Sequence, residues 1–254
     1  MPVKLTIITA TYNRGHVLKG CLESVIMQKF KDIEHIIIDN MSSDNTQKIV
    51  EDYIKKADYK VRYIREPDTG IYNAFNKGIR LAEGEWIHFL SSDDVYYDTE
   101  LLNSIFSDDI DSYDLLACGI YFNYKSNKKY SEPHIDKNCH EFKFPHTGTI
   151  LKRNFLINNG LYNEDLKIAS DRVFNWQFYD KAKHKIINSP LVLMSTLGVS
   201  STFTLSYIME RIKVYWLFGK FSIAFKINIT IKEVVNLKQV IIIKIVNKLK
   251  NVFK

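Results

Sequence analysis

Two adjacent carboxylates, Asp93 and Asp94, lie two serines beyond the apolar run 86–90 (WIHFL). Adjacent carboxylates repel each other unless a cation or hydrogen bonds neutralise them, so this pair is a candidate ligand set for a divalent metal ion. Magnesium or manganese, with a diphosphate completing the oxygen ligands, suits such a pair better than zinc. The pair by itself is also typical of a turn or a helix cap before Val95.

Two further polar clusters follow other apolar runs. Thr11–Asn13 comes after the run 3–9, and Asp39 with Asn40 ends a run of three isoleucines. The carboxyl ends of neighbouring parallel strands meet at one edge of a sheet, where ligands bind. We therefore expect the three clusters to lie together, although an Asp at a strand end is also typical of a cap.

The sequence contains no glycine-rich phosphate-binding loop. Neither GxGxxG nor GxxxxGK[ST] occurs, which disfavours a Rossmann dinucleotide enzyme and a P-loop NTPase. A GxSxG nucleophile elbow is also missing. If this chain binds a nucleotide, its phosphates must be met by a metal ion rather than by glycine amides.

Strands and helices are predicted to alternate through residues 1–110. Hydrophobic periodicity indicates strands over 3–9, 35–39, 61–65 and 85–90, and helices over 17–26, 47–56 and 71–82. This alternation predicts an α/β fold with a mainly parallel sheet flanked by helices.

Beyond residue 110 the expected elements are shorter and less regular. We predict a strand over 115–124, a hairpin through 125–129 and a helix around 171–181. No linker rich in Pro, Gly or Ser separates this half from the first, so residues 1–110 and 111–202 are expected to share one core. Residues 203–254 form a separate tail.

Composition indicates a folded globular chain. The 254 residues are 46% hydrophobic and 25% charged, with ten Gly and five Pro. Three widely spaced cysteines (Cys21, Cys118 and Cys139) without a CxxC pair suggest neither a disulfide framework nor a structural zinc site. The first apolar run is too short for a secretory signal, and no uncharged apolar stretch approaches about 18 residues. We therefore expect a cytoplasmic protein without a transmembrane helix.

Basic charge is concentrated in the tail. Residues 203–254 hold ten Lys or Arg and two Glu, a net charge of +8, so residues 1–202 carry −2 of the formal total of +6. Lysines recur mostly every four to six residues among apolar ones, which is typical of amphipathic helices on an anionic membrane surface. The alternatives are a helical hairpin packed on the main domain and nucleic-acid binding. Nucleic acid is disfavoured because the tail has no recognised binding motif and few interleaved aromatics.

Four segments in combination resemble the inverting glycosyltransferases of family 2, which have a GT-A fold. They are TIITATYNR (6–14), HIIIDNMSSDNT (35–46), REPDTGIYNAFNKGIRLAEGEWIHFLSSDD (65–94) and KIASDRVFNW (167–176). The resemblance implies transfer of a sugar from a nucleotide diphosphate donor to an acceptor hydroxyl, usually with Mg²⁺ or Mn²⁺. It also implies a nucleotide-sugar-binding half over 1–110 and an acceptor-binding half over 111–202 of one domain.

The resemblance assigns roles to individual residues. Six of them are implied to bind the donor: Tyr12, Asp39, Asp68, Asn76, Lys77 and Asp93. Asp94 matches the acid that holds the metal on the diphosphate, and Asp171 matches the catalytic base. His146 is a further metal or diphosphate contact by the resemblance, and is equally typical of a capped loop histidine.

A few positions depart from the common family pattern. Asn40 and Met41 stand where an acid and Gly are frequent, Ser92 where Ala is, and Arg172 where an aromatic is common. These departures leave the reaction class intact and bear on the choice of donor and acceptor.

The resemblance favours a transferase that moves a sugar, UDP-linked in most members, to a polyprenyl-diphosphate-linked oligosaccharide in bacterial surface polysaccharide (O-antigen or capsule) synthesis. Inversion is one in-line displacement, which needs one base and one electrophilic group at the leaving diphosphate. The basic tail fits a cytoplasmic protein held peripherally on the inner face of the cell membrane.

Two other functions are considered. A sugar-1-phosphate nucleotidyltransferase is disfavoured because residues 9–15 contain a single glycine, Gly15. A catalytically silent nucleotide-binding scaffold is disfavoured by the acids Asp39, Asp93, Asp94 and Asp171, which all remain in place.

Overall fold

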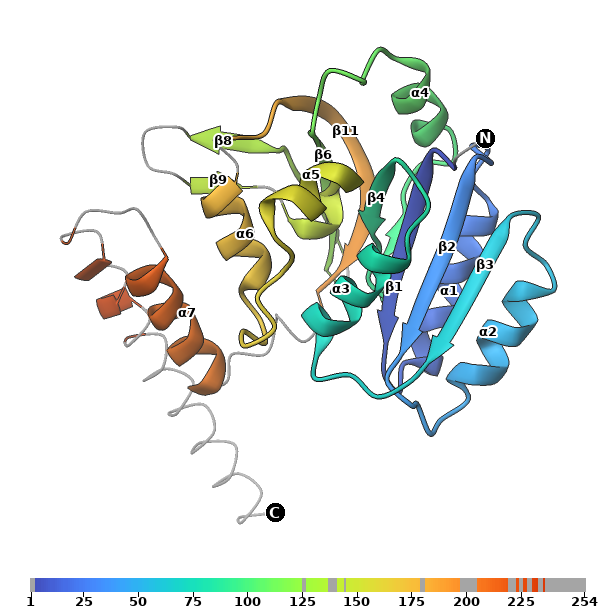
Figure 1. Cartoon of the computed structure of the whole chain (residues 1–254), viewed down its shortest axis with the longest axis horizontal. Helices are drawn as coiled ribbons and strands as arrows, with labels where there is room; N and C mark the ends of the chain where they lie inside the picture. The colour runs from blue at the N-terminus through green and yellow to red at the C-terminus, as the bar shows by residue number, and fades with distance from the viewer. Residues whose placement is uncertain are drawn as a thin grey trace.

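The structure is a computed structural model of the chain (Figure 1). It describes residues 3–124, 127–136, 141–143, 145–178, 181–196 and 205–218, together with a few positions between 223 and 235. Most of the predicted basic tail, including Lys220, Lys238, Lys244 and the residues after them, lies outside the described residues.

The first half alternates strands and helices as predicted. The elements are β1 (Leu5–Thr11), α1 (Gly15–Ile26), β2 (Ile33–Asp39), α2 (Thr46–Ile54), β3 (Lys60–Arg65), α3 (Ile71–Leu81) and β4 (Trp86–Phe89). Strands β3, β2, β1 and β4 are neighbours in this order and are all parallel.

The second half continues the same sheet. Its elements are β5 (Val95–Tyr96), α4 (Leu101–Ser107), β6 (Leu115–Tyr124), β7 (Asn127–Ser131), β8 (His134–Asp136), β9 (Glu141–Lys143), the 3₁₀ turn η1 (His146–Gly148), β10 (Thr149–Lys152), α5 (Arg153–Asn159), α6 (Ser170–Phe178), β11 (His184–Ser195) and α7 (Leu205–Leu217). The sheet order is β3-β2-β1-β4-β10-β6-β11-β5, with β7 beside β6 and with β8 and β9 pairing separately.

The expectation of a mainly parallel sheet holds for the first half, and the complete sheet is mixed. Strand β10 runs antiparallel between β4 and β6, and β5 and β7 are also antiparallel to their neighbours. A strand that runs antiparallel to its neighbour can be connected by a short loop, whereas a parallel strand needs a long crossover that is usually helical. The helix predicted around 171–181 is α6, which ends at Phe178.

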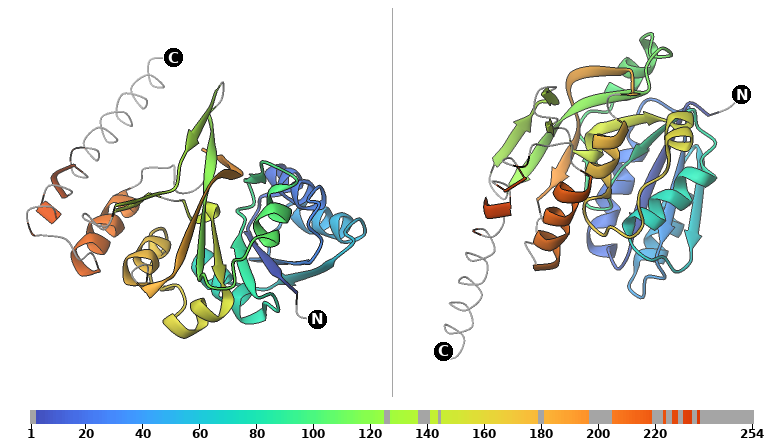
Figure 2. Two further views of the ribbon diagram at one scale, coloured as in Figure 1. Left: turned by 90° about the horizontal axis from the view of Figure 1, so that it is seen from above. Right: turned by 60° about the vertical axis from the view of Figure 1, so that its left-hand side comes forward.

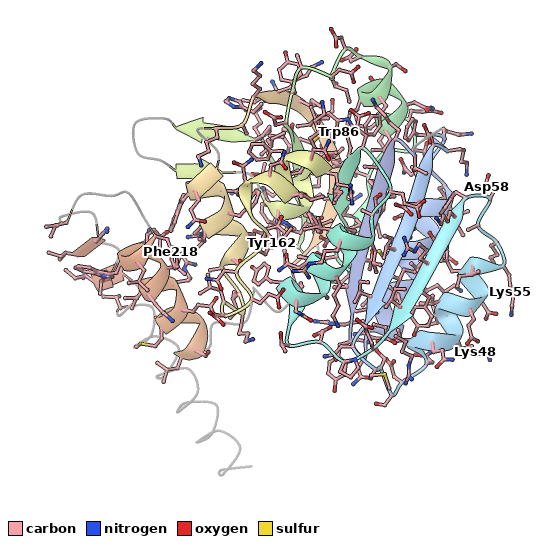
Figure 3. The ribbon with its side chains drawn as sticks, in the orientation of Figure 1. Lys48, Lys55, Asp58, Trp86, Tyr162 and Phe218 are labelled. Atoms are coloured by element: carbon pink, nitrogen blue, oxygen red, sulfur yellow. The ribbon has the colours of Figure 1, made fainter. Side chains whose placement is uncertain are left out.

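Helices cover both faces of the sheet (Figures 1 and 2). In β2, Ile36 and Ile38 pack toward α3, whereas Ile37 packs toward α1 and α2. Burial on both faces explains why this strand is continuously apolar instead of alternating. Figure 3 shows Trp86 of β4 within the body of the molecule, while Lys48 of α2 and Lys55, just after that helix, lie at its outer edge.

Two histidines are buried beside β1. His35 Nδ1 lies 2.6 Å from the Tyr53 hydroxyl and its Nε2 lies 3.0 Å from Thr9 Oγ1, while His88 bonds Tyr96 and the Thr147 carbonyl. Burial lowers the pKa of His35 to about 3 and that of His88 to about 4. Both rings are therefore neutral in the folded protein at neutral pH.

We expect these rings to make the fold acid-sensitive. Unfolded histidine has a pKa of about 6.5, so below that pH the unfolded chain binds more protons, and each ring lowers the free energy of unfolding by up to about 1.4 kcal/mol per pH unit. Urea denaturation of the wild type and of His35→Gln between pH 7 and pH 5 measures this. The variant should lose stability less steeply with falling pH, and equal slopes would contradict the prediction.

Candidate active site

A cavity of about 550 Å³ lies at the carboxyl ends of β1 and β4. Its walls come from the loops after β1, β2 and β4, the start of α3, the turn η1, the start of α6 and the end of β11. The strand ends therefore meet where the sequence predicted. Thr11, Tyr12, Asn40, Asp93 and Asp94 from the three polar clusters all line the cavity.

Six of the nine predicted site residues line this cavity: Tyr12, Asp68, Asp93, Asp94, His146 and Asp171. Asp39, Asn76 and Lys77 are not among the lining residues.

Asp94 is a buried carboxylate with one oxygen left unpaired. Asp94 is only 2% exposed, and its Oδ1 accepts a hydrogen bond of 2.8 Å from the Ser195 amide. Oδ2 is buried and has no hydrogen-bond partner among the described residues. Burial, with the like charge of Asp93 as a smaller cause, raises the pKa of Asp94 to about 7. A group in this state favours the approach of a cation.

The residues present fit a divalent metal ion only as part of its ligand shell. The unpaired Oδ2 of Asp94 and the neighbouring acid Asp93 are oxygen donors of the kind that Mg²⁺ and Mn²⁺ prefer. Across the described part of the chain, no three His, Cys, Asp or Glu side chains are grouped to hold a metal. The remaining ligands would have to come from a bound molecule or water.

His146 reaches the cavity from η1 within an aromatic cluster. Its ring stacks on Phe75 at 5.3 Å and lies 4.7 Å from the ring of Phe89, and Nε2 lies 2.7 Å from the Tyr162 hydroxyl. Burial lowers the pKa of His146, so the ring is neutral at pH 7. A metal contact from His146 stays a prediction, with Nε2 already occupied by Tyr162.

Asp171 accepts a hydrogen bond from a tyrosine that the sequence analysis did not single out. Tyr72, near the start of α3, donates a 3.0 Å hydrogen bond from its hydroxyl to Asp171 Oδ1. Burial and the charge of Asp171 raise the pKa of Tyr72 well above its ordinary value, which keeps the hydroxyl a donor. The segment GIYNAFNKG already contained Tyr72, but only its position relative to Asp171 reveals the role.

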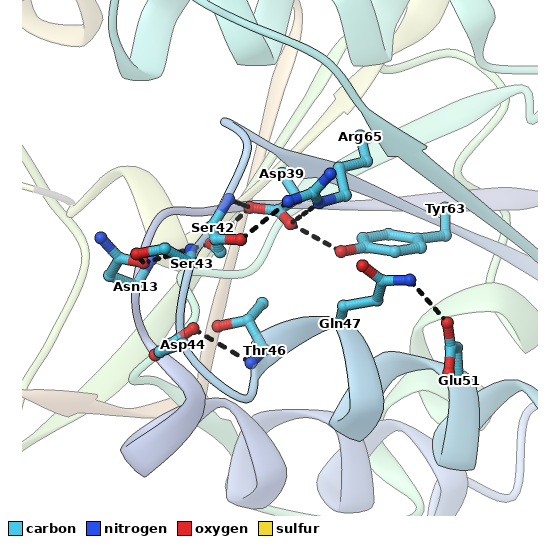
Figure 4. Close-up of polar contacts among 10 residues, drawn as sticks. All are labelled: Asn13, Asp39, Ser42, Ser43, Asp44, Thr46, Gln47, Glu51, Tyr63 and Arg65. Carbon is cyan, nitrogen blue, oxygen red and sulfur yellow. Dashed lines mark hydrogen bonds and ion pairs between the residues drawn. The ribbon is translucent and has the colours of Figure 1, made fainter.

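Asp39 faces into the fold (Figure 4). It is fully buried, and Oδ1 accepts hydrogen bonds from the amide and hydroxyl of Ser42. Oδ2 accepts a 2.6 Å bond from the Tyr63 hydroxyl and lies 3.7 Å from Arg65 Nε. The structure thus places Asp39 where it holds the loop after β2, and donor contact by its carboxylate stays a prediction.

The loop after β2 in turn holds the loop after β1 (Figure 4). The Asn13 amide donates to Ser42 Oγ at 2.8 Å, and the Ser43 amide donates to Asn13 Oδ1 at 2.8 Å. Asn13 adopts a positive φ of 52°, which Asn tolerates better than most residues. These contacts position the loop that carries Tyr12, a cavity-lining residue that is 57% exposed.

Asn76 and Lys77 of α3 are not among the cavity-lining residues, and both bond to neighbouring segments of the chain. Asn76 Nδ2 donates to the Tyr162 carbonyl and to Glu164, and Oδ1 accepts from the Tyr162 amide. Lys77 Nζ donates to the Pro67 carbonyl at 2.7 Å. Both side chains therefore fix segments that border the cavity, and direct donor contact by either stays a prediction.

Asp68 lines the cavity at the turn into α3. Its Oδ1 accepts a 2.8 Å bond from the amide of Gly70, and its own amide donates to Asn40 Oδ1 at 2.8 Å. Gly70 has a φ of 139°, a backbone conformation that favours glycine. Burial raises the pKa of Asp68 above its ordinary value.

Two cations that sequence interpretation did not single out also line the cavity, Arg14 and Lys167. Lys167 Nζ donates to the Thr69 carbonyl at 2.8 Å, which places its charge beside the turn into α3. The cavity thus combines four carboxylates with two cations. Such a lining suits a ligand that carries both a metal ion and phosphate groups.

The fold and this site match a known family. The family model described as glycosyl transferase family 2 matches residues 6–175. The chain belongs to this family.

Two individual relatives described as glycosyltransferases are each 27% identical to this chain. A Bacillus subtilis protein described as uncharacterized glycosyltransferase EpsJ is 27% identical over 197 residues, which cover 70% of this chain and 57% of the relative's length. A PGL/p-HBAD biosynthesis glycosyltransferase of Mycobacterium tuberculosis is 27% identical over 172 residues, or 67% of each chain.

Solved structures confirm the GT-A-like fold. The crystal structure of S. aureus TarS in complex with UDP-GlcNAc has a TM-score of 0.69 at 21% identity, covering 91% of this chain and 71% of that one. Mannosyltransferase PcManGT from Pyrobaculum calidifontis, in complex with GDP-Man and Mn²⁺, has a TM-score of 0.60 at 17% identity, covering 84% and 61%.

We expect Asp94→Asn to stabilise the metal-free protein at alkaline pH. Because the folded-state pKa of Asp94 is raised to about 7, its ionisation opposes folding increasingly as pH rises from about 4 to 7. In chelator, the Tm of the variant should exceed that of the wild type at pH 8, and the difference should vanish near pH 4. Asp93→Asn, at the half-buried neighbour, should show a smaller effect. A lower Tm for Asp94→Asn at pH 8 would contradict this account.

Proposed function

We propose that the protein transfers a sugar from a nucleotide diphosphate donor to an acceptor hydroxyl with inversion. The observation that carries the proposal is that one cavity contains both the unpaired carboxylate of Asp94 and the tyrosine-bound carboxylate of Asp171. The first is suited to a cation on a diphosphate, and the second to accepting a proton.

The residues divide the chemistry between the two substrates. On the donor side, the exposed ring of Tyr12 offers a stacking surface for the base, and Arg14 and Lys167 supply positive charge for phosphate oxygens. Asp94 and Asp93 would hold Mg²⁺ or Mn²⁺. A bound ion of this kind neutralises charge that develops on the leaving diphosphate.

On the acceptor side, Asp171 takes the proton. The acceptor oxygen forms a bond to the anomeric carbon as the bond from that carbon to the diphosphate oxygen breaks, and the acceptor proton passes to the Asp171 carboxylate. Tyr72 donates to Oδ1, which leaves Oδ2 for the acceptor. A single base and a single displacement invert the anomeric configuration.

A UDP-sugar is the proposed donor. TarS, the structural neighbour with the TM-score of 0.69, was crystallised with UDP-GlcNAc, whereas the more distant PcManGT was crystallised with GDP-Man. GDP- and dTDP-sugars are the natural comparisons in a binding experiment.

The proposed acceptor is a polyprenyl-diphosphate-linked saccharide in surface polysaccharide synthesis, met at the inner face of the cell membrane. An exposed apolar stripe on α7 supports this. Leu205 and Met209 are each 58% exposed and Trp216 is 44% exposed, at helical spacings that place them on one face with Ile212. Among the described residues no helix is long and apolar enough to cross a membrane, so contact would be peripheral.

Donor binding and turnover should separate in two variants. A UDP-sugar with Mn²⁺ should raise the Tm of the wild type and of Asp171→Asn, whereas Asp94→Asn should lose the metal-dependent rise. Transfer to a polyprenyl-diphosphate-linked acceptor should fall about 10²–10⁴-fold in Asp171→Asn, since the base is lost. Wild-type turnover in that variant would refute the assignment, and donor binding without transfer in the wild type would favour the scaffold.

The α7 stripe should bind anionic membranes. The full chain should sediment with vesicles that contain phosphatidylglycerol more than with pure phosphatidylcholine, and less at high salt. The triple variant Leu205→Ser, Met209→Ser, Trp216→Ser should weaken binding, whereas Ile157→Ser, at an exposed isoleucine on α5, should not. Equal sedimentation of both variants would instead favour a tail that packs on the main domain.

A further inference from the structure

The C-terminal helix α7 lies beside α6, the helix that carries Asp171 (Figures 1 and 2). An apolar cluster joins them, with Val173 and Trp176 of α6 packed on Val214 and Tyr215 of α7. The same cluster includes Leu166 and Ala169, so the contact with α7 extends along α6 to the residues just before that helix.

One acidic side chain of α7 binds the backbone immediately before α6. Glu210 Oε2 accepts a 2.9 Å hydrogen bond from the Lys167 amide, and Oε1 accepts bonds of 2.7 and 2.9 Å from the amides of Ile168 and Ala169. Three successive amides thus point at one carboxylate. The carboxylate also lies at the positive end of the α6 dipole, which adds to its attraction.

We propose that Glu210 is a positioning residue for Asp171. Only Ser170 separates the last of the three amides from Asp171, so the carboxylate of Glu210 fixes the point at which the helix starts. Tyr72 holds the Asp171 side chain from the donor half, and Glu210 holds its backbone from the C-terminal helix. This inference rests on the proposed function of Asp171.

Arg172 strengthens the same junction. Its guanidinium donates a 2.7 Å hydrogen bond to the Tyr215 hydroxyl and lies over the rings of Trp176 and Tyr215 at 6.0 and 5.7 Å. This explains why a cation occupies a position where family members commonly have an aromatic. The apolar cluster and Arg172 keep α7 attached to α6 independently of Glu210, so removing Glu210 should release the turn 167–169 without detaching the helix.

The first test is kinetic. Glu210→Ala should lower kcat about 10²-fold, the cost of a misplacement of about 1 Å. Glu210→Gln, which keeps one oxygen acceptor, should fall between Ala and the wild type. Tyr215→Phe on the same interface should change kcat little.

The decisive experiment combines Glu210→Ala with Asp171→Asn in a double variant. If Glu210 acts through Asp171, it should have little further effect on the residual rate there, because the base that it positions is already gone. An undiminished loss in that background would overturn the proposal.

Hydrogen exchange tests the same contact without any activity. Amides 167–169 should exchange faster in Glu210→Ala than in the wild type or in Tyr215→Phe, and unchanged protection would overturn the proposal. If the wild type transfers no sugar but amides 167–169 still exchange faster in Glu210→Ala than in the wild type, the proposed function is wrong and the contact itself is confirmed.

Discussion

Strand β10 holds the two halves of the molecule in one sheet, and the cavity depends on it. It pairs antiparallel with β4 on one side and β6 on the other, with Ile150 opposite both His88 and Leu116. The turn that precedes it is tied to β4, because His88 Nε2 bonds the Thr147 carbonyl. This contact brings residues 145–147 to the edge where β1 and β4 end, so the second half closes a cavity that the parallel strands begin.

The two buried aspartates Asp39 and Asp94 differ in how many of their carboxylate oxygens are hydrogen-bonded. Burial removes the hydration of a carboxylate, and the cost is offset by hydrogen bonds, by a cation or by protonation. Asp39 receives hydrogen bonds from Ser42 and Tyr63 on both oxygens and lies near Arg65, so the fold itself satisfies it. Asp94 Oδ1 accepts a bond from the Ser195 amide and the nearby Ser91 and Thr147 side chains contribute less, while its buried second oxygen has no hydrogen-bond partner of normal geometry among the described residues. The first residue therefore shapes the loops, and the second is suited to binding.

The helix that carries Asp171 is held from two directions. Tyr72 belongs to α3 in the first half of the chain, and Glu210 belongs to α7 near the C-terminal end of the described chain. The exposed side chains of Leu205 and Met209 lie on the face of α7 opposite Val214, which packs on α6. Helix α7 thus has exposed apolar side chains and also packs on the helix that carries Asp171, which links this part of the chain to the cavity.

The sequence by itself determined the alternation of strands and helices through the first half, and the place of Tyr12, Asp93 and Asp94 at strand ends, because hydrophobic periodicity is a local property. It also placed Asp171 at the start of a helix. Only the tertiary structure decided that β10 enters between β4 and β6, that Asp39 and Asn76 bond within the fold and are not among the cavity-lining residues, and which groups contact Asp171. These outcomes rest on contacts between residues far apart in the chain: Asp39 with Tyr63 across 24 positions, Asn76 with Tyr162 across 86, and Tyr72 with Asp171 across 99. Packing sets which of those distant groups meet, and no local pattern records it.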